Sequence, residues 1–156
     1  MALTVEDGTS KSDADSYVAT VDCATYYTNM GYTDTAADEP LRRGTVFLDN
    51  RFLGRWKGTK ATSGQALQWP RDSMVDEDGN GIDADTIPQK IVDACCEAGR
   101  IVPITQSVDS AQLIESVKAG SVEVKFAAAQ QQRAILDLVD ELVAPFLNPS
   151  GILVRA

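Results

Sequence analysis

The segment 76–83, DEDGNGID, holds the residue types most able to bind a metal ion in this sequence. A calcium-binding loop places ligands at positions 1, 3 and 5 and a bidentate glutamate at position 12. The first three ligand positions are matched, by Asp76, Asp78 and Asn80. Position 12 is Ile87, whose side chain has no oxygen. Because aspartate, glycine and asparagine also form tight turns, we favour a turn here and keep weak calcium binding as the alternative.

Histidine is absent from the sequence, which removes the usual general base, the common serine and cysteine nucleophile arrangements and histidine metal sites. The sequence also has no glycine-rich phosphate loop and no dinucleotide-binding fingerprint. Its 3 cysteines, an odd number with two adjacent, argue against a disulfide framework and fit small buried side chains. We therefore predict a protein that is not an enzyme and that takes no cofactor.

The chain is strongly acidic, with 23 Asp and Glu against 14 Lys and Arg and a net charge of -9. Such a surface on average repels nucleic acid and anionic membranes. One basic cluster interrupts it, formed by Arg51, Arg55, Lys57 and Lys60, with Arg71 further along. Because runs of charge usually lie on solvated surfaces, we interpret this cluster first as a solvated loop. The composition thus argues against non-specific binding of DNA.

A length of 156 residues suits one domain with a single core. The sequence shows neither a secretory signal at its N-terminus nor an apolar run long enough to span a membrane, so we expect folding in a cytoplasm. We predict a flexible arm over residues 1–15, a single helical domain over 16–146 with a long ordered loop over 54–85, and an extended tail over 147–156.

Apolar periodicity and helix-breaking residues predict a mainly α protein. Gly31 ends the first predicted helix, and Pro103 ends the third. Between the third and last helices, residues 113–126 alternate with a period of two on either side of Gly120, which indicates a β-hairpin. The expected fold is a small bundle of about four helices with one β-hairpin and extended termini. The helices are expected over residues 20–30, 40–52, 88–102 and 127–147.

Several short motifs resemble a family of tailed-phage virion proteins. They are Phe52–Gly58 (FLGRWKG), Gln65–Arg71 (QALQWPR), the aspartate–glycine turn, and Ile87 with Pro88 at the start of a helix. In these respects the chain is similar, over about residues 16–102, to head-tail connector or adaptor proteins, many of which carry the label of a DnaT-like single-stranded DNA-binding protein.

The resemblance implies a structural virion protein that forms a homomeric ring, commonly a dodecamer, between portal and tail. The implied partners are other copies of itself, the portal protein, a downstream neck or tail protein, and double-stranded DNA that passes without specific binding. No membrane is among the implied partners. The implied location is the neck of the virion, with the host cytoplasm during assembly. An acidic ring would let a polyanion slide without sticking, which agrees with this resemblance.

The alternative is a single-stranded nucleic-acid-binding module in phage or bacterial replication. Such a module needs a basic groove interleaved with exposed aromatic side chains. The residues that could form one are Arg55, Trp56, Lys57, Trp69 and Arg71. We favour a different interpretation, in which the two tryptophans fix the long loop onto the helices while the charged groups stay solvated.

Two segments are candidate interfaces with a second subunit or another partner. One is the tryptophan loop, since Trp and Arg are enriched at protein interfaces. The other is the C-terminal segment, whose apolar residues could dock on a partner or equally on their own domain. The candidate interface residues are Arg55, Trp56, Lys57, Trp69, Pro70, Arg71, Phe146, Leu147, Ile152, Leu153, Val154 and Arg155.

Overall fold

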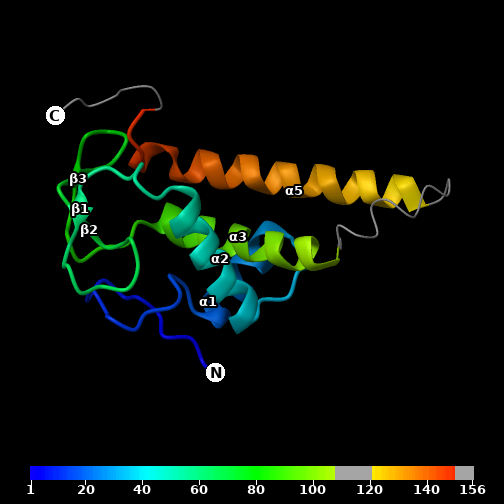
Figure 1. Ribbon diagram of the computed structural model, residues 1–156, viewed down its shortest axis with the longest axis horizontal. Helices are drawn as coiled ribbons and strands as arrows, with labels where there is room; N and C mark the ends of the chain where they lie inside the picture. The colour runs from blue at the N-terminus through cyan, green and yellow to red at the C-terminus, as the bar shows by residue number, and fades with distance from the viewer. Residues whose placement is uncertain (108–120, 150–156) are drawn as a thin grey trace.

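The computed structural model describes residues 1–107 and 121–149, with 102–107 and 121–128 described by their backbone alone. Four α-helices are described, together with a 3-10 turn, η1 (Ala144–Phe146), that continues the last of them (Figure 1). The mainly α prediction is confirmed. Among the described helices, none is both long and apolar enough to cross a bilayer. The helices are α1 (Thr20–Met30), α2 (Asp38–Arg51), α3 (Gln89–Ser107) and α5 (Ser121–Val143).

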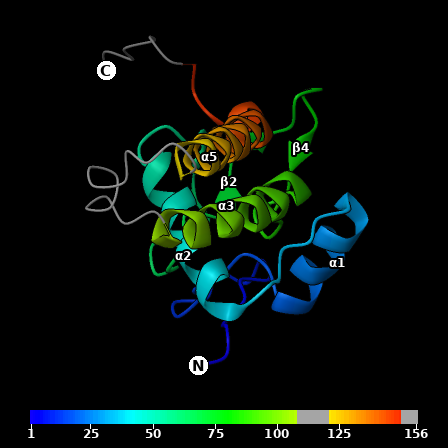
Figure 2. The same cartoon turned by 90° about the vertical axis from the view of Figure 1, so that its right-hand side faces the viewer.

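Helix α3 is the centre of the bundle. Both α2 and α5 pack along it, and α1 makes a smaller contact with it. Figure 2 shows this arrangement, with α5 on one side of α3 and α1 and α2 on the other. The central position follows from the sequence, because Ile91, Ala94, Cys95 and Ala98 on α3 are all fully buried and recur at helical spacing.

Helices α2 and α3 approach each other closely through glycine. A Cβ atom placed on Gly44 of α2 would lie 2.7 Å from the backbone nitrogen of Gly99 on α3. Close by, Thr45 Oγ1 lies 3.1 Å from Cys95 Sγ. All three cysteines of the chain are free and buried, as predicted for small apolar side chains.

The observed helix boundaries follow from local chemistry with one exception. Gly31 ends α1 with a positive φ of 75°, as predicted, and its N–H donates to the Thr28 carbonyl. Pro40 lies in the first turn of α2, where the missing N–H is tolerated. Helix α3 begins directly after Pro88 but continues through Pro103 to Ser107, so the predicted end at Pro103 is wrong. A proline inside a helix removes one hydrogen bond and does not always end the helix.

The predicted β-hairpin over residues 113–126 is wrong in its second half. Residues 113–120 lie outside the described residues, and from Ser121 onward the chain is helical. The alternation of Val122, Val124 and Phe126 is too short to decide between a strand and a helix. The Ala- and Gln-rich run that follows it, residues 127–132, has high helix propensity, and the helix extends back from there.

The strands lie instead in the segment 54–85, which we predicted as a loop without regular structure. Strands β1 (Thr59–Lys60) and β2 (Arg71–Asp72) pair antiparallel, as do β3 (Met74–Val75) and β4 (Gly81–Ile82). Each strand has 2 residues, which is too short to produce an alternating pattern in the sequence. Over the described residues, the fold is therefore four packed helices with two small antiparallel sheets.

The N-terminal residues, predicted as a flexible arm, fold around a buried carboxylate. Glu6 is 2% exposed, and its side chain accepts hydrogen bonds from the backbone N–H groups of Gly8, Ser10 and Lys11 at 2.8–3.0 Å. Val5 also forms an isolated parallel β-bridge with Ser16. At the other end Leu147 is buried, and residues 150–156 lie outside the described residues. The domain boundaries at residues 15 and 147 stay predictions.

Candidate nucleic-acid interface

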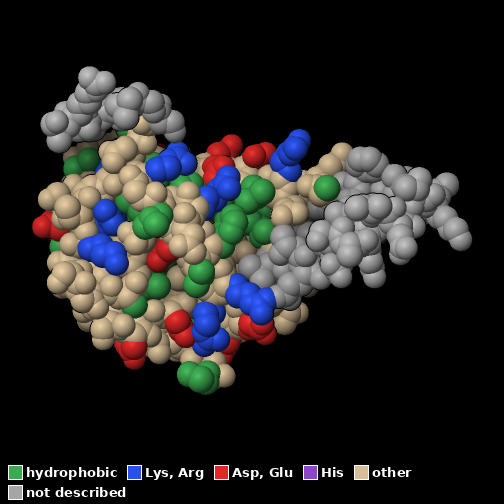
Figure 3. All heavy atoms as spheres, in the orientation of Figure 1, with side chains coloured by type: hydrophobic (Ala, Val, Ile, Leu, Met, Phe, Trp, Pro, Cys, Tyr) green, Lys and Arg blue, Asp and Glu red, His purple; other side chains and the backbone are tan. Residues whose placement is uncertain are grey.

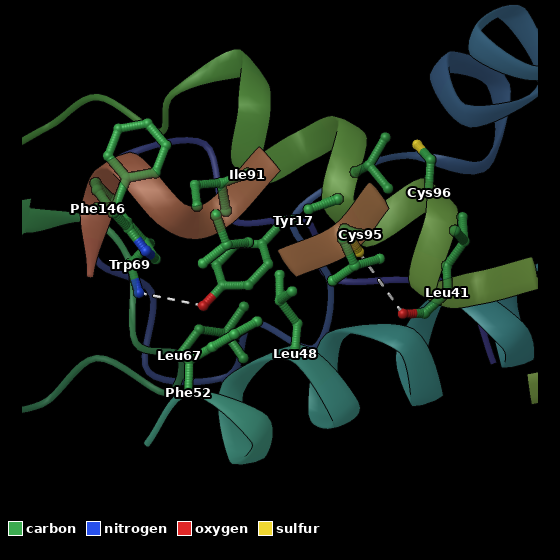
Figure 4. Packing of buried hydrophobic residues seen from close by; sticks show 14 of the residues in the cluster. Tyr17, Leu41, Leu48, Phe52, Leu67, Trp69, Ile91, Cys95, Cys96 and Phe146 are labelled. Carbon is green, nitrogen blue, oxygen red and sulfur yellow. Dashed lines mark hydrogen bonds between the residues drawn. The ribbon is translucent and has the colours of Figure 1, made fainter. Parts of the chain in front are cut away.

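Two tryptophans anchor the long loop in the hydrophobic core. Trp56 is 5% exposed and Trp69 is 0% exposed, and their ring centroids lie 5.8 Å apart at 88°. Trp56 also packs edge-on against Phe52, which directly follows α2, and Trp69 packs against Phe146 of η1. Figure 4 shows Trp69 between Phe146 and the hydroxyl of Tyr17, to which its backbone N–H donates. The indole rings therefore order the loop and do not offer their faces to DNA bases.

Arg71 also serves the loop. It is 7% exposed, and its guanidinium donates to the carbonyl oxygens of Lys57, Gly58 and Gln68 at 2.7, 2.9 and 3.1 Å. Burial lowers the pKa of this guanidinium. Because these bonds use its donors inside the fold, Arg71 joins the strands of the loop and does not present its charge to a ligand.

Asp49 is a carboxylate of α2 that turns inward. Its Oδ1 accepts the Tyr17 hydroxyl at 2.6 Å, and its Oδ2 accepts the Gln68 N–H at 3.1 Å. Burial raises the pKa of Asp49 to about 6. The pKa of the Tyr17 hydroxyl is raised by burial and by this carboxylate, so it stays a neutral donor. Asp49 is the single acidic residue in the stretch 41–71, so the direction of its side chain affects the charge that this stretch presents to solvent.

The charge of the chain is divided unevenly along its length. Residues 41–71 contain 7 Lys and Arg and 1 Asp, a net charge of +6. The rest of the chain contains 7 Lys and Arg and 22 Asp and Glu, a net charge of -15. The basic cluster itself was predicted, but as a solvated loop; the whole-chain charge hides the near absence of acidic residues around it, which a count of charges in a moving window shows. An acidic protein can thus carry a surface that attracts nucleic acid.

Three cations of the basic segment meet at a groove of about 490 Å³ where the ends of α2 and α5 come together. Arg55 and Lys57 line it, and Arg51 is ion-paired to the lining residue Asp140. We call this the basic groove. Its other lining residues include Phe52, Leu147 and Asn148.

The backbone around Trp56 sets the positions of these cations. Trp56 forms an antiparallel bridge with Leu147, in which the Lys57 N–H donates to the Phe146 carbonyl at 2.9 Å and the Asn148 N–H donates to the Arg55 carbonyl at 2.8 Å. In extended backbone, neighbouring side chains point to opposite sides. Because Trp56 points into the core, the side chains of Arg55 and Lys57, which precede and follow it in the chain, both point to the surface.

The side chains at the basic groove make further contacts. The Arg55 guanidinium lies 5.7 Å from the ring centroid of Phe52. Lys57 Nζ donates to the Pro145 carbonyl at 2.9 Å, which leaves its remaining N–H bonds for other acceptors. Figure 3 shows this side of the molecule, where Lys and Arg side chains lie over α2 and the loops next to it, with exposed apolar side chains and several Asp and Glu side chains among them.

Other cations of the segment lie outside the basic groove. Lys60 is on β1, and its Nζ donates to the Gln65 carbonyl at 3.4 Å. At the start of α2, the side chains of Arg42 and Arg43 pair with carboxylates. The predicted cluster is therefore partly brought together, with Arg51, Arg55 and Lys57 at one groove and Lys60 apart from it.

The candidate metal segment forms the turn between β3 and β4. The Asp76 N–H donates to the Asn80 carbonyl at 2.8 Å, and Asp76 Oδ1 accepts the N–H groups of Asp78 and Asn80. These hydrogen bonds lower the pKa of Asp76. The Asn80 amide directs its NH₂ donor at the Asp76 carboxylate, an orientation that suits a turn and not a cation. In the part of the chain that the structure describes, no group of three or more His, Cys, Asp or Glu residues could hold a metal ion.

Next to this turn lies a second depression of about 430 Å³, between the turn, the start of α3 and η1. Its lining includes four carboxylates, those of Asp76, Glu77, Asp78 and Asp83. One cation also lines it, Lys90, which pairs with Glu77 at 2.9 Å. This depression repels polyanions, so it is not a candidate site for nucleic acid.

The remaining predicted interface residues differ in how they are placed. Trp56, Trp69 and Arg71 are buried as described above, and so are Pro70, Phe146 and Leu147. Among the described members of that set, Arg55 and Lys57 keep surface for a partner. Four further members lie outside the described residues, namely Ile152, Leu153, Val154 and Arg155.

A family model described as "Putative DnaT-like ssDNA binding protein" matches residues 1–156. No curated protein and no solved structure matches the chain. The full-length match shows that the head-tail connector assignment is wrong, and with it the homomeric ring and the portal and tail partners. The motifs on which that assignment was based include Trp56, Trp69 and Arg71. All three are buried, and they order the long loop.

The family is described by DNA binding and not by a catalytic activity. Its description supports the alternative that the sequence left open, a single-stranded nucleic-acid-binding module. The chain belongs to the family of DnaT-like single-stranded-DNA-binding proteins.

Proposed function

We propose that this protein binds single-stranded DNA at the basic groove, as a non-catalytic component of DNA replication. The observation that carries the proposal is the division of charge, in which residues 41–71 hold +6 on a chain of -9. The single carboxylate of that stretch, Asp49, is hydrogen-bonded to Tyr17 and Gln68 and does not line the basic groove. The family match is the second support.

Binding at this groove is mainly electrostatic. Arg51, Arg55 and Lys57 are the cations that would contact successive phosphates, and each contact releases counterions from the strand. The acidic remainder of the chain repels the polyanion and confines it to this side. Because phosphates are the same in every sequence, this mode carries little base preference.

Base contacts are limited to what the surface offers. Trp56 and Trp69 are buried, so stacking on indole rings does not contribute. Val46 is 54% exposed and Leu53 is 62% exposed, both within the basic segment. They can give apolar contact to unpaired bases, which are splayed out in a single strand and stacked away in a duplex. We therefore expect a preference for single strands, with moderate affinity.

The proposal is tested by fluorescence anisotropy with a labelled oligothymidylate of about 20 nucleotides, titrated at several salt concentrations. The double variant Arg55→Gln/Lys57→Gln removes two phosphate contacts and should bind about tenfold more weakly, with a shallower salt dependence. The matched control is the double variant Lys90→Gln/Arg133→Gln, which removes two cations that do not line the basic groove and should bind like the wild type. Circular dichroism should show that all variants are folded.

Two results would contradict the proposal. One is the lack of saturable binding by the wild type at low salt. The other is an equal loss in Arg55→Gln/Lys57→Gln and in Lys90→Gln/Arg133→Gln, which would place the effect in the net charge and not in the groove.

A further inference from the structure

Arg51, in the last turn of α2, holds a carboxylate that comes from α5. Its Nε donates to Asp140 Oδ1 at 2.8 Å, and its Nη2 donates to Asp140 Oδ2 at 2.7 Å. Two parallel bonds of this kind are the arrangement in which a guanidinium also binds a phosphate group. Arg51 is thus already set in the geometry of a phosphate contact, with a carboxylate as the anion.

Asp140 is a carboxylate at the basic groove, next to three cations. It lines the basic groove together with Arg55 and Lys57, and it reaches the groove from a helix outside the basic segment. The ion pair is accessible, since the Arg51 and Asp140 side chains are 34% and 44% exposed. Ion pairs this exposed contribute little to folding stability, so the need to hold α2 against α5 does not by itself explain the carboxylate.

We propose that Asp140 pairs with the Arg51 guanidinium where a backbone phosphate of single-stranded DNA would bind, and so weakens binding of the strand at the basic groove. The inference rests on the proposed function. When a strand binds, its phosphodiester takes the two Arg51 donors, and Asp140 loses its partner beside Arg55 and Lys57. In the wild type, binding at Arg51 exchanges one ion pair for another, so this arginine adds little net affinity, and the cation that the freed Asp140 takes up from solution offsets the counterion that the phosphate releases.

Removing the charge of Asp140 should therefore strengthen binding. Asp140→Asn leaves Arg51 without a carboxylate, and the oligothymidylate should bind about fivefold more tightly, the upper range for breaking an exposed ion pair. The salt dependence should steepen by about 0.7 in the log–log slope, the value for one further phosphate contact to a single strand. The double variant Arg51→Gln/Asp140→Asn should show neither the tighter binding nor the steeper salt dependence, because it has no Arg51 guanidinium to contact the phosphate.

The matched control is Glu141→Gln, which changes the net charge equally on the next residue of α5 and is exposed. It does not line the groove, and its affinity should change by less than about twofold. Equal gains in Asp140→Asn and Glu141→Gln would overturn the inference and leave the proposed function standing. Failure of both the wild type and Asp140→Asn to bind would overturn the proposed function, and this inference with it.

Discussion

Asp49 shows how one residue joins the fold of the loop to the charge of the surface. Its carboxylate accepts hydrogen bonds from Tyr17 and Gln68, so it connects α2 to the segment before α1 and to the long loop over residues 54–85. Burial raises its pKa to about 6, while the nearby charges of Lys60 and Arg71 lower it by less. The sequence predicts neither effect, because nothing in it shows which way an aspartate two residues before the basic cluster points.

A raised pKa makes a prediction about stability and pH. The folded protein holds a proton on Asp49 more tightly than the unfolded chain does, so this group stabilises the fold below pH 4 and loses that contribution as pH rises through 6. The loss is about 3 kcal/mol for a shift from 3.8 to about 6. Urea unfolding should show the wild type losing stability relative to Asp49→Asn over this range. A carboxyl midpoint near 4 for Asp49, measured by carbon NMR, would contradict the prediction.

At the scale of the elements, the contact of α2 with α3 depends on glycine. Gly44→Ala would place a Cβ 2.7 Å from the Gly99 backbone nitrogen, which cannot move without displacing α3. We expect a loss of about 1–3 kcal/mol in the free energy of unfolding, although alanine is the better helix former. Gly64→Ala is the control, because a Cβ there meets nothing within 4 Å. An equally stable Gly44→Ala protein would show that the helices are not held at this distance.

The elements that could be predicted from the sequence are those with long periodic patterns and clear end signals. Helix α1 ends at Gly31 as expected, and α5 buries Ile135, Val139 and Val143, which recur at helical spacing. The missed elements are the short ones. Strands β1 to β4 have 2 residues each and are held by tertiary contacts, among them the clamp of Arg71. The false hairpin came from an alternation that a neighbouring helix-forming run outweighed.

The candidate site was predicted only in part. Arg51, Arg55, Lys57 and Lys60 were recognised as a cluster, and the structure brings the first three together. The sequence does not predict Asp140 as part of the site. It lies 89 residues after Arg51 and reaches the groove only through the packing of α5. The tryptophans that suggested a base-stacking groove are in the core, since large aromatic side chains order a long loop best when buried.

At the scale of the whole molecule, the protein combines an acidic body with one basic segment. This division explains how a chain of net charge -9 can belong to a family described by DNA binding. It also predicts that the bound strand touches a limited part of the surface, because the acidic depression beside the β3–β4 turn repels phosphate.

The most direct test is to map where single-stranded DNA touches the protein, using amide NMR shifts during a titration with oligothymidylate at low salt. Binding at the basic groove should shift the amides of residues 51–60 and of Asp140, and should leave residues 76–90 around the acidic turn unchanged. The shifts should reverse when salt is added, because the contacts are electrostatic. Shifts centred on residues 76–90, or no saturable shifts at all, would contradict the conclusion that the basic segment is the binding surface.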